Sequence, residues 1–229
     1  MPTFKHRLQA GERVAMVNVG GRNPDIIGVL ARHGADAAFI DCERSGIGID
    51  SSAELLFAAR ACRLPALVRP HSAAPAELIR YLDRGADGLI IPHCKSPEDA
   101  LAATEVMRFA FGAAAGSRTL IIQIETKEAV ASLEQIASIP GIDAFLIGPN
   151  DLAWELCGER GARSAEVTQA VDDICARLSS MGKRYGMPCR LDEAMAFSKR
   201  GCTLIYYSVN WLIETGLQAL GAPDASLGG

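Results

Sequence analysis

Two acidic residues, Glu125 and Asp151, have the type and placement that divalent-metal chemistry needs. Glu125 stands at the end of an apolar run over residues 120–126, and Asp151 comes shortly after another run over residues 144–149. If these runs are neighbouring parallel strands, both carboxylates point into the same end of the sheet. Two oxygen ligands with open positions suit Mg2+ or Mn2+, completed by water and a chelating substrate. The spacing supports a competing interpretation equally well, in which each acid stabilises the dipole of a following helix.

A basic residue and a turn favour the chemical interpretation. Arg69 ends a further apolar run over residues 65–70, and its permanently charged guanidinium suits a carboxylate or an enolate oxygen. Gly148-Pro149-Asn150 leads into a predicted helix start, where free backbone N–H groups bind anions. Both features are typical of a site for a small anionic substrate.

Eight short apolar runs alternate with longer amphipathic stretches along the chain. They are apolar almost throughout, as expected of strands that are covered on both faces. At about 28 residues per strand and helix, the pattern predicts a (β/α)8 TIM barrel that spans residues 1–229 as a single domain. A doubly wound sheet is disfavoured because no GxGxxG motif follows the first run. The predicted strands are residues 13–19, 37–42, 65–70, 88–92, 120–126, 144–149, 184–189 and 203–209.

Glycine and capping residues indicate where helices begin and end. Ser96, followed by Pro97 and two acids, predicts a helix start. The Gly- and Ala-rich residues 112–117 are expected to form a loop. Three predicted helices end on a glycine, where a left-handed backbone is favoured, namely residues 24–34, 74–85 and 191–201.

Composition excludes several classes of protein. The 229 residues are 49% hydrophobic and 22% charged, which is typical of a globular protein with a large core. The formal charge of −4, from 23 basic and 27 acidic residues, argues against a nucleic-acid binder. Seven cysteines without a CxxC pair predict reduced thiols in a cytoplasmic protein. A polar N-terminus and the lack of an apolar run of about 20 residues argue against secretion and a membrane span.

Four motifs resemble the HpcH/HpaI family of metal-dependent, class II pyruvate aldolases. That family includes 4-hydroxy-2-oxoheptanedioate aldolase and 2-dehydro-3-deoxyglucarate aldolase. The resemblance runs in the expected order over nearly the whole chain. The motifs are Gln123-Ile124-Glu125-Thr126, Ile147-Gly148-Pro149-Asn150-Asp151-Leu152, Val68-Arg69-Pro70 and Gly88-Leu89-Ile90-Ile91-Pro92.

The resemblance implies a barrel of the phosphoenolpyruvate/pyruvate-superfamily type, assembled as a trimer or hexamer with the last helix exchanged between subunits. It implies that Glu125 and Asp151 bind a divalent metal (Mg2+, Mn2+ or Co2+) and that Arg69 contacts the keto or enolate oxygen. By the same resemblance, Gln123 lines the site, and the backbone of Gly148, Pro149 and Asn150 lies where the pyruvate carboxylate is held.

One motif departs from the family pattern. Where the family carries Asp-x-Glu-His, this chain has Asp41-Cys42-Glu43-Arg44, and Asp83 matches the aspartate that a neighbouring subunit supplies to the family's His. Arg44 cannot accept a proton near neutral pH, so it cannot be a general base. A metal-bound water, His93 or His71 are the possible replacements, with His93 the best placed. A positioning role is the competing interpretation for His93.

Two further positions bear on the substrate. Arg44 is interpreted either as a cation for a carboxylate or phosphate at the distal end of the substrate, or as an ion-pair partner of Glu43, Asp41 or a neighbour's Asp83. Asn18 stands where some relatives carry a Trp that lines the pocket, which predicts a changed aldehyde pocket.

Three functions follow from these residues. The first is an aldolase that cleaves a 4-hydroxy-2-oxo acid to pyruvate and an aldehyde, or runs the reverse addition. The second is a decarboxylase of oxaloacetate-type β-keto acids, which needs an electron sink but no base for a hydroxyl proton. The third is a silent relative that binds a keto acid, which the presence of both Glu125 and Asp151 disfavours. Cys42 and Cys94 lie close enough to the predicted mouth to suggest alkylation as a probe.

Overall fold

The fold is a closed barrel of eight parallel strands, seen in a computed structural model that describes residues 3–161, 164–191 and 193–221. Each strand pairs with the next in sequence, and β8 closes the ring on β1. All eight predicted strands are confirmed. They are β1 (Val14–Asn18), β2 (Ala37–Asp41), β3 (Ala66–Arg69), β4 (Gly88–Ile91), β5 (Thr119–Ile124), β6 (Ala144–Ile147), β7 (Tyr185–Pro188) and β8 (Leu204–Ser208).

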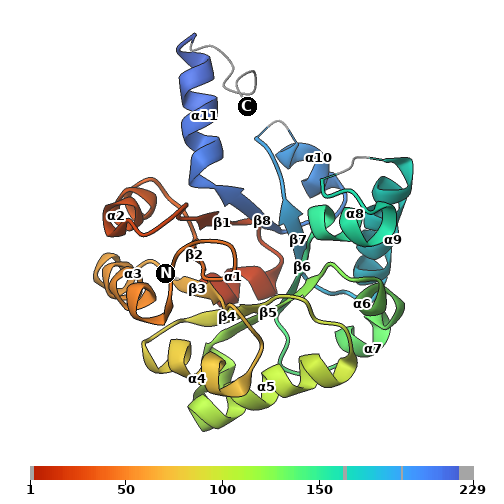
Figure 1. The fold of residues 1–229 in the computed structure, drawn as a ribbon, viewed down its shortest axis with the longest axis horizontal. Helices are drawn as coiled ribbons and strands as arrows, with labels where there is room; N and C mark the ends of the chain where they lie inside the picture. Colours follow the sequence, from red (N-terminus) through yellow and green to blue (C-terminus); the bar gives the residue numbers. More distant parts are fainter. Residues whose placement is uncertain (1–2, 162–163, 192, 222–229) are drawn as a thin grey trace.

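Helices surround the strands on the outside of the barrel, as Figure 1 shows. They cover the outer faces of the strands, which explains why the strands are apolar on both faces. They are α2 (Pro24–Arg32), α3 (Ile49–Cys62), α4 (Pro75–Asp83), α5 (Pro97–Phe111), α6 (Lys127–Ala131), α7 (Leu133–Ala137), α8 (Pro149–Cys157), α9 (Ala165–Ser180) and α10 (Ala194–Lys199). None of the helices in the described part of the chain is long and apolar enough to cross a membrane.

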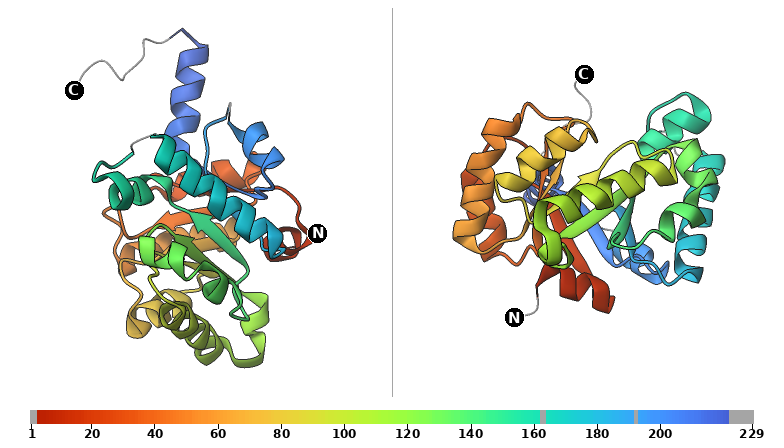
Figure 2. Two further views of the ribbon diagram at one scale, coloured as in Figure 1. Left: turned by 90° about the vertical axis from the view of Figure 1, so that its right-hand side faces the viewer. Right: turned by 90° about the horizontal axis from the view of Figure 1, so that it is seen from below.

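Two helices, α1 and α11, do not belong to the outer layer that covers the strands. The short α1 (Phe4–Ala10) buries Phe4 and Leu8 in the cluster of side chains that fills the barrel interior. In contrast, α11 (Val209–Ala219) projects away from the barrel, as Figure 1 and the left view of Figure 2 show. Along α11 only Val209 is buried.

The predicted helix boundaries agree with the structure to within two residues for α2 and α4, whereas α10 begins three residues later than predicted. Gly34, Gly85 and Gly201 have positive φ angles of 85°, 94° and 87°, the conformation that glycine adopts without a steric penalty. Ser96 begins α5 with a capping box that includes Asp99. The expectation of a loop was wrong at residues 112–117, which form the 3-10 helix η1 (Gly112–Ser117).

Side chains alternate between the barrel interior and the outer layer with the period of two that strands impose. On β2, Ala37 and Phe39 belong to the interior cluster, whereas Ala38 and Ile40 pack against the helices. On β5, Ile121 points inward in the same way. Residues two further along each strand therefore continue the inward series toward the carboxyl end of the barrel.

The cysteines are all free, as their spacing predicted, but two of them are buried more deeply than the sequence suggested. Cys42 and Cys94 pack in the layer between strands and helices. Burial raises the pKa of each thiol to about 11. Their use as alkylation probes of the mouth is therefore a wrong expectation, because neither the exposure nor the thiolate that alkylation needs is present.

We expect iodoacetamide at pH 7.5 to modify the exposed Cys62 and Cys157 and to leave Cys42 and Cys94 unmodified in the folded protein. Peptide mass spectrometry after brief labelling measures this, and labelling in urea provides the control in which all sites react. Early modification of Cys42 or Cys94 in the native protein would contradict the burial described above.

Candidate active site

A cavity opens at the carboxyl ends of the strands, on the end of the barrel opposite α1. Its bottom consists of the inward-facing Phe39 and Leu146, and its wall carries most of the ionisable residues singled out from the sequence. This is the end at which barrel enzymes place their chemistry. The cavity is lined by Phe39, Asp41, Arg44, Arg69, Gln123, Glu125, Leu146, Ile147, Gly148, Pro149, Asn150, Asp151, Arg160, Pro188, Tyr206 and Trp211.

The polar residues of the wall continue the inward series of their strands. Asp41 lies two residues beyond Phe39, and Gln123 lies two beyond Ile121. Arg69 and Tyr206 follow Leu67 and Leu204 in the same way. The alternation that buries apolar side chains in the barrel therefore also points these polar groups into one space.

Arg69 forms a buried ion pair across β2 and β3. Its Nε and Nη2 donate to Asp41 Oδ1 and Oδ2 at 3.0 and 2.6 Å. Glu43 Oε2 lies 3.1 Å from the same Nε. Burial lowers the pKa of the Arg69 guanidinium, but the hydrogen bonds and charge of Asp41 and the charge of Glu43 outweigh burial and raise it. Arg69 is therefore a fixed cation at the base of the cavity.

Asp41 also fixes the loop that follows β2. Its Oδ1 accepts the backbone N–H groups of Glu43 and Arg44, each at 3.2 Å. One carboxylate thus orients the Arg69 guanidinium and sets the course of the chain toward the Arg44 side chain.

Glu125 is the most deeply buried acid of the cavity, with 1% of its surface exposed. Gln123 donates to its Oε2 at 2.8 Å, and the backbone N–H of His93 donates to its Oε1 at 2.8 Å. Burial raises the pKa of the Glu125 carboxyl, and the nearby charges of Asp151 and Glu43 raise it further. A cation placed beside Glu125 and Asp151 would relieve this repulsion.

His93 connects two acids from the rim of the cavity. Its Nε2 lies 3.0 Å from Glu43 Oε1, and its Nδ1 lies 3.3 Å from Glu125 Oε1. Its backbone has a φ of 52°, a left-handed conformation that is uncommon for a residue other than glycine. The hydrogen bonds to Glu125 and Glu43 hold the residue in that conformation, which is typical of a functional position.

Gly148 gives the Glu125 carboxylate room beside the start of α8. A Cβ atom at Gly148 would lie 2.6 Å from Glu125 Oε2 and 2.8 Å from its Cβ, so a larger residue would displace Glu125. Asn150 and Asp151 lie in the first turn of α8, where backbone N–H groups have no partner within the helix. The turn therefore offers anion-binding N–H groups and the Asp151 carboxylate side by side.

Asp151 is held by two arginines. Its Oδ1 is 2.8 Å from Arg44 Nη2 and 3.0 Å from Arg160 Nη2. Arg44 Nε is also 3.2 Å from Glu43 Oε1. The predicted ion pair of Arg44 with Glu43 is therefore present, but its shorter contact is with Asp151, which the sequence did not suggest.

Besides His93 at the rim, three predicted residues are not among the described residues that line this cavity. Asn18 donates to the hydroxyl of Tyr206, which lines the cavity, at 2.8 Å; its own role toward the substrate stays a prediction. His71 is exposed, and its backbone is bound to Glu77, so it does not replace the missing histidine in the described cavity. Asp83 is exposed at the last residue of α4, and its role toward a neighbouring subunit stays a prediction.

Four residues of the site were not selected from the sequence. Glu43 belongs to the motif Asp41-Cys42-Glu43-Arg44, but its contacts with Arg69 and His93 join distant parts of the chain, and the sequence does not indicate them. Tyr206 and Trp211 meet edge to face at 6.3 Å, and burial raises the pKa of the Tyr206 phenol, which keeps it protonated. Arg160 follows α8 in an irregular segment, where no local pattern indicates a site.

The described residues fit an open divalent-cation site. They contain no group of three or more His, Cys, Asp or Glu side chains that would enclose a metal. Instead, Glu125 and Asp151 line one cavity and their charges repel each other, and this cavity is open, so that water or a substrate can complete the coordination. One or two carboxylates with other positions left open are what Mg2+ prefers.

Comparison with known proteins places most of the chain in one family. The model of the HpcH/HpaI aldolase/citrate lyase family matches residues 14–198. A hydroxypyruvate/pyruvate aldolase of Sagittula stellata is 29% identical over 85% of this chain and 86% of its own length. A pyruvate aldolase of Rhizobium etli is 30% identical over 80% of this chain and 81% of its own. The crystal structure of a family protein from Burkholderia cenocepacia J2315 superimposes with a TM-score of 0.86 at 27% identity, covering 95% and 97% of the two chains.

Asp41→Asn should destabilise the fold, because the new amide group faces the Arg69 Nη2 donor and leaves a buried guanidinium with Glu43 alone. We expect the free energy of unfolding to fall by about 3 kcal/mol, the lower end of the range for breaking a buried pair. Urea denaturation followed by circular dichroism measures it. Glu54→Gln, which breaks the exposed pair with Arg22, should leave the urea midpoint unchanged; equal midpoints for the two variants would contradict this account of Arg69.

Proposed function

The chain belongs to the HpcH/HpaI aldolase/citrate lyase family, and we propose that it cleaves a 4-hydroxy-2-oxo acid to pyruvate, or a close 2-oxo acid, and an aldehyde. The same site would catalyse the reverse aldol addition. The observation that carries the proposal is the approach of Glu125 and Asp151 in one cavity beside the buried cation of Arg69. The names of similar proteins, hydroxypyruvate/pyruvate aldolase and pyruvate aldolase, support the same reaction.

The reaction needs positive charge at a defined oxygen. Cleavage between C3 and C4 leaves an electron pair on the 2-oxo acid fragment, and the negative charge spreads to its keto oxygen. A divalent ion held by Glu125 and Asp151, with Mg2+, Mn2+ or Co2+ our expected ions, supplies a Lewis acid for that oxygen. Arg69 supports the same role because its Nη1 reaches only Gln123, at 3.4 Å, and so keeps N–H donors for a substrate.

The first turn of α8 is suited to the carboxylate of the 2-oxo acid. The N–H groups of Asn150 and Asp151 face the cavity end of the helix, where the helix dipole also favours an anion. Gly148 and Pro149 complete this turn, and Gln123 orients Glu125 beneath it. In this proposal the chain binds both ends of the 2-oxo acid head with groups that are already in place.

The proton of the C4 hydroxyl is the difficult part of aldol cleavage here. Arg44 cannot accept it, and the raised pKa of Tyr206 disfavours that phenol as a base. We assign His93 a positioning role, because its ring and backbone contact Glu43 and Glu125 from the rim. No histidine is found among the described residues that line the cavity.

This last observation favours a second candidate activity, decarboxylation of an oxaloacetate-type β-keto acid. Loss of CO2 leaves the same electron pair on the same fragment but requires no base for a hydroxyl proton. Arg69, Glu125 and Asp151 would act as in the aldol reaction. The two activities share the electron sink and differ in the proton acceptor.

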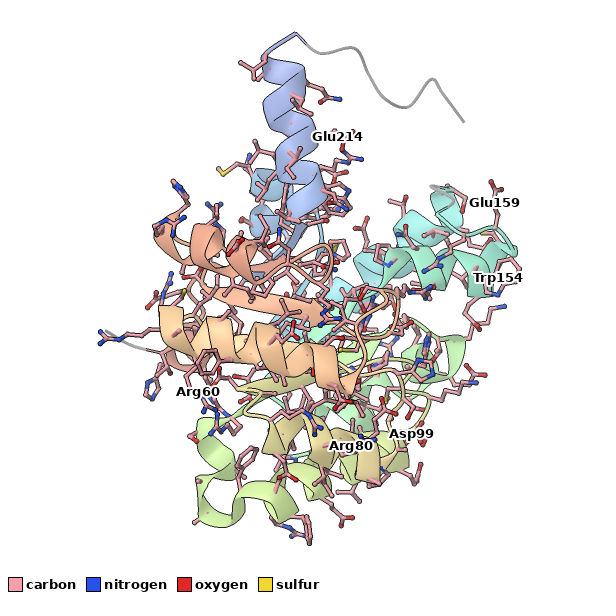
Figure 3. All side chains as sticks on the ribbon, turned by 60° about the vertical axis from the view of Figure 1, so that its left-hand side comes forward. Arg60, Arg80, Asp99, Trp154, Glu159 and Glu214 are labelled. Atoms are coloured by element: carbon pink, nitrogen blue, oxygen red, sulfur yellow. The ribbon has the colours of Figure 1, made fainter. Side chains whose placement is uncertain are left out.

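The projecting helix α11 supports assembly with further copies of the chain. Its Leu212, Ile213 and Leu217 and the following Leu220 are exposed, and Figure 3 shows the helix standing clear of the barrel with Glu214 labelled. Leu212 and Ile213 also border an apolar hollow between β1 and α2. We propose that α11 of one copy packs against another copy in a trimer or hexamer, because an apolar stripe of this kind is normally covered.

The activity is tested by pyruvate release from 4-hydroxy-2-oxo acids and from oxaloacetate, with Mg2+, Mn2+ or Co2+ and with or without a chelator. We expect cleavage that the chelator abolishes, and a loss of kcat/KM of roughly 10^2- to 10^3-fold in Glu125→Gln, which removes a charge that the transition state requires. Glu54→Gln serves as the exposed control. Activity with oxaloacetate alone would favour the decarboxylase. Activity that neither the chelator nor Glu125→Gln reduces would contradict the proposed metal site.

The assembly is tested by light scattering after size-exclusion chromatography. We expect a mass of three or six times the 24.3 kDa of one chain, and dissociation in the double variant Ile213→Glu/Leu217→Glu, because buried charges disrupt an apolar interface. Phe109→Glu, at an even more exposed apolar position on α5, is the control. A monomeric wild-type protein would contradict the proposal.

A further inference from the structure

We propose that Arg44 and Arg160 together bind a second carboxylate, at the distal end of the substrate, so that this enzyme prefers dicarboxylic substrates. The inference rests on the proposed function, because it takes the 2-oxo acid head to lie against Glu125, Asp151 and Arg69. It adds to that function the chemical class of the part that becomes the aldehyde.

The two guanidinium groups converge on a single point although they come from different segments. Arg44 lies in the loop after β2, and Arg160 lies three residues after the end of α8. Both line the cavity, and both place an Nη2 within 3.0 Å of the same oxygen, Asp151 Oδ1. Two arginines that share one carboxylate oxygen already form an arrangement that holds a carboxylate.

The depth of the three cavity arginines assigns them to different parts of a substrate. The side chain of Arg69 is 10% exposed, that of Arg44 is 33% exposed and that of Arg160 is 48% exposed. Arg69 therefore serves the buried end of the cavity, whereas Arg44 and Arg160 stand nearer its opening. A substrate whose 2-oxo acid head occupies the buried end directs its other end toward Arg44 and Arg160.

Arg44 and Arg160 need a further anion because both contact the same carboxylate, that of Asp151. In the proposed function the Asp151 carboxylate also serves a divalent cation, and a carboxylate cannot fully neutralise that cation and two guanidinium groups together. A carboxylate from the substrate would take the position relative to Arg44 and Arg160 that Asp151 Oδ1 has in this structure. Neither arginine is needed for the chemistry at the keto oxygen, where Arg69 acts.

The test compares pairs of 2-oxo acids that have equal chain length and differ in the distal carboxylate. Calorimetry with Mg2+ present measures the Kd of 2-oxoadipate against 2-oxohexanoate, and of 2-oxoglutarate against 2-oxopentanoate. We expect the dicarboxylate of at least one pair to bind the wild-type protein about ten- to a hundredfold more tightly, as charge-assisted hydrogen bonds allow. In Arg44→Met and Arg160→Met this preference should largely disappear, while the Kd of the monocarboxylates changes little.

Arg22→Met is the matched control, because Arg22 is an exposed arginine that pairs with Glu54 and does not line the cavity. Mn2+ binding without any 2-oxo acid gives a second readout. Because Arg44 and Arg160 compete with the cation for Asp151, each Met variant should bind Mn2+ several-fold more tightly than wild type.

The outcomes separate the two proposals. Equal affinity for both members of each pair, or a preference that survives in both Met variants, overturns the distal-carboxylate assignment and leaves the aldolase proposal standing. Equal weakening of the mono- and dicarboxylates in the Met variants also overturns it, because the arginines would then hold the head carboxylate. If no 2-oxo acid binds with Mg2+ present, the proposed function itself fails.

Discussion

A guanidinium group in the inner layer of a barrel must be paired, because the interior cannot solvate its charge. Here Asp41 supplies the pair for Arg69, and its Oδ1 also accepts the two backbone N–H groups that direct the loop toward Arg44. From Arg69 the contacts continue through Gln123 to Glu125. The positions of Arg44, Gln123 and Glu125 are thus linked to one buried ion pair between β2 and β3.

The arginine at position 44 changes the electrostatics of the cavity without removing its acids. A guanidinium at this position contacts Glu43 and Asp151 and brings a permanent charge that cannot accept a proton near neutral pH. Arg160 adds a second charge on the same Asp151 oxygen. The cavity therefore combines a buried cation at its base with two more exposed cations near its opening, an arrangement that suits a substrate with an anion at each end.

The barrel architecture explains how a few strand ends bring the polar side chains of the cavity together. Strand alternation sends every second residue inward, so a strand that fills the core with Phe39 or Ile121 presents Asp41 or Gln123 to the cavity two residues later. Helix α8 begins directly after β6, which brings Gly148 against Glu125 and its first-turn N–H groups to the same opening. At the amino end α1 packs Phe4 and Leu8 against the interior cluster, and the cavity described above opens at the carboxyl end.

The sequence by itself determined the eight strands, most helix boundaries and the acids and arginine that follow the strands, because these depend on local hydrophobic period, capping and glycine. Glu125, Asp151 and Arg69 were found in this way, and Gln123 followed from the family resemblance. The sequence did not find Arg160, the pairing of Arg44 with Asp151, or the contact of Asn18 with Tyr206. These contacts depend on how loops that are far apart in the chain come together over the barrel. No local sequence pattern indicates which loops will meet. The burial that makes the Cys42 and Cys94 thiols unreactive also depends on tertiary structure, because both pack between the strand and helix layers of the closed barrel.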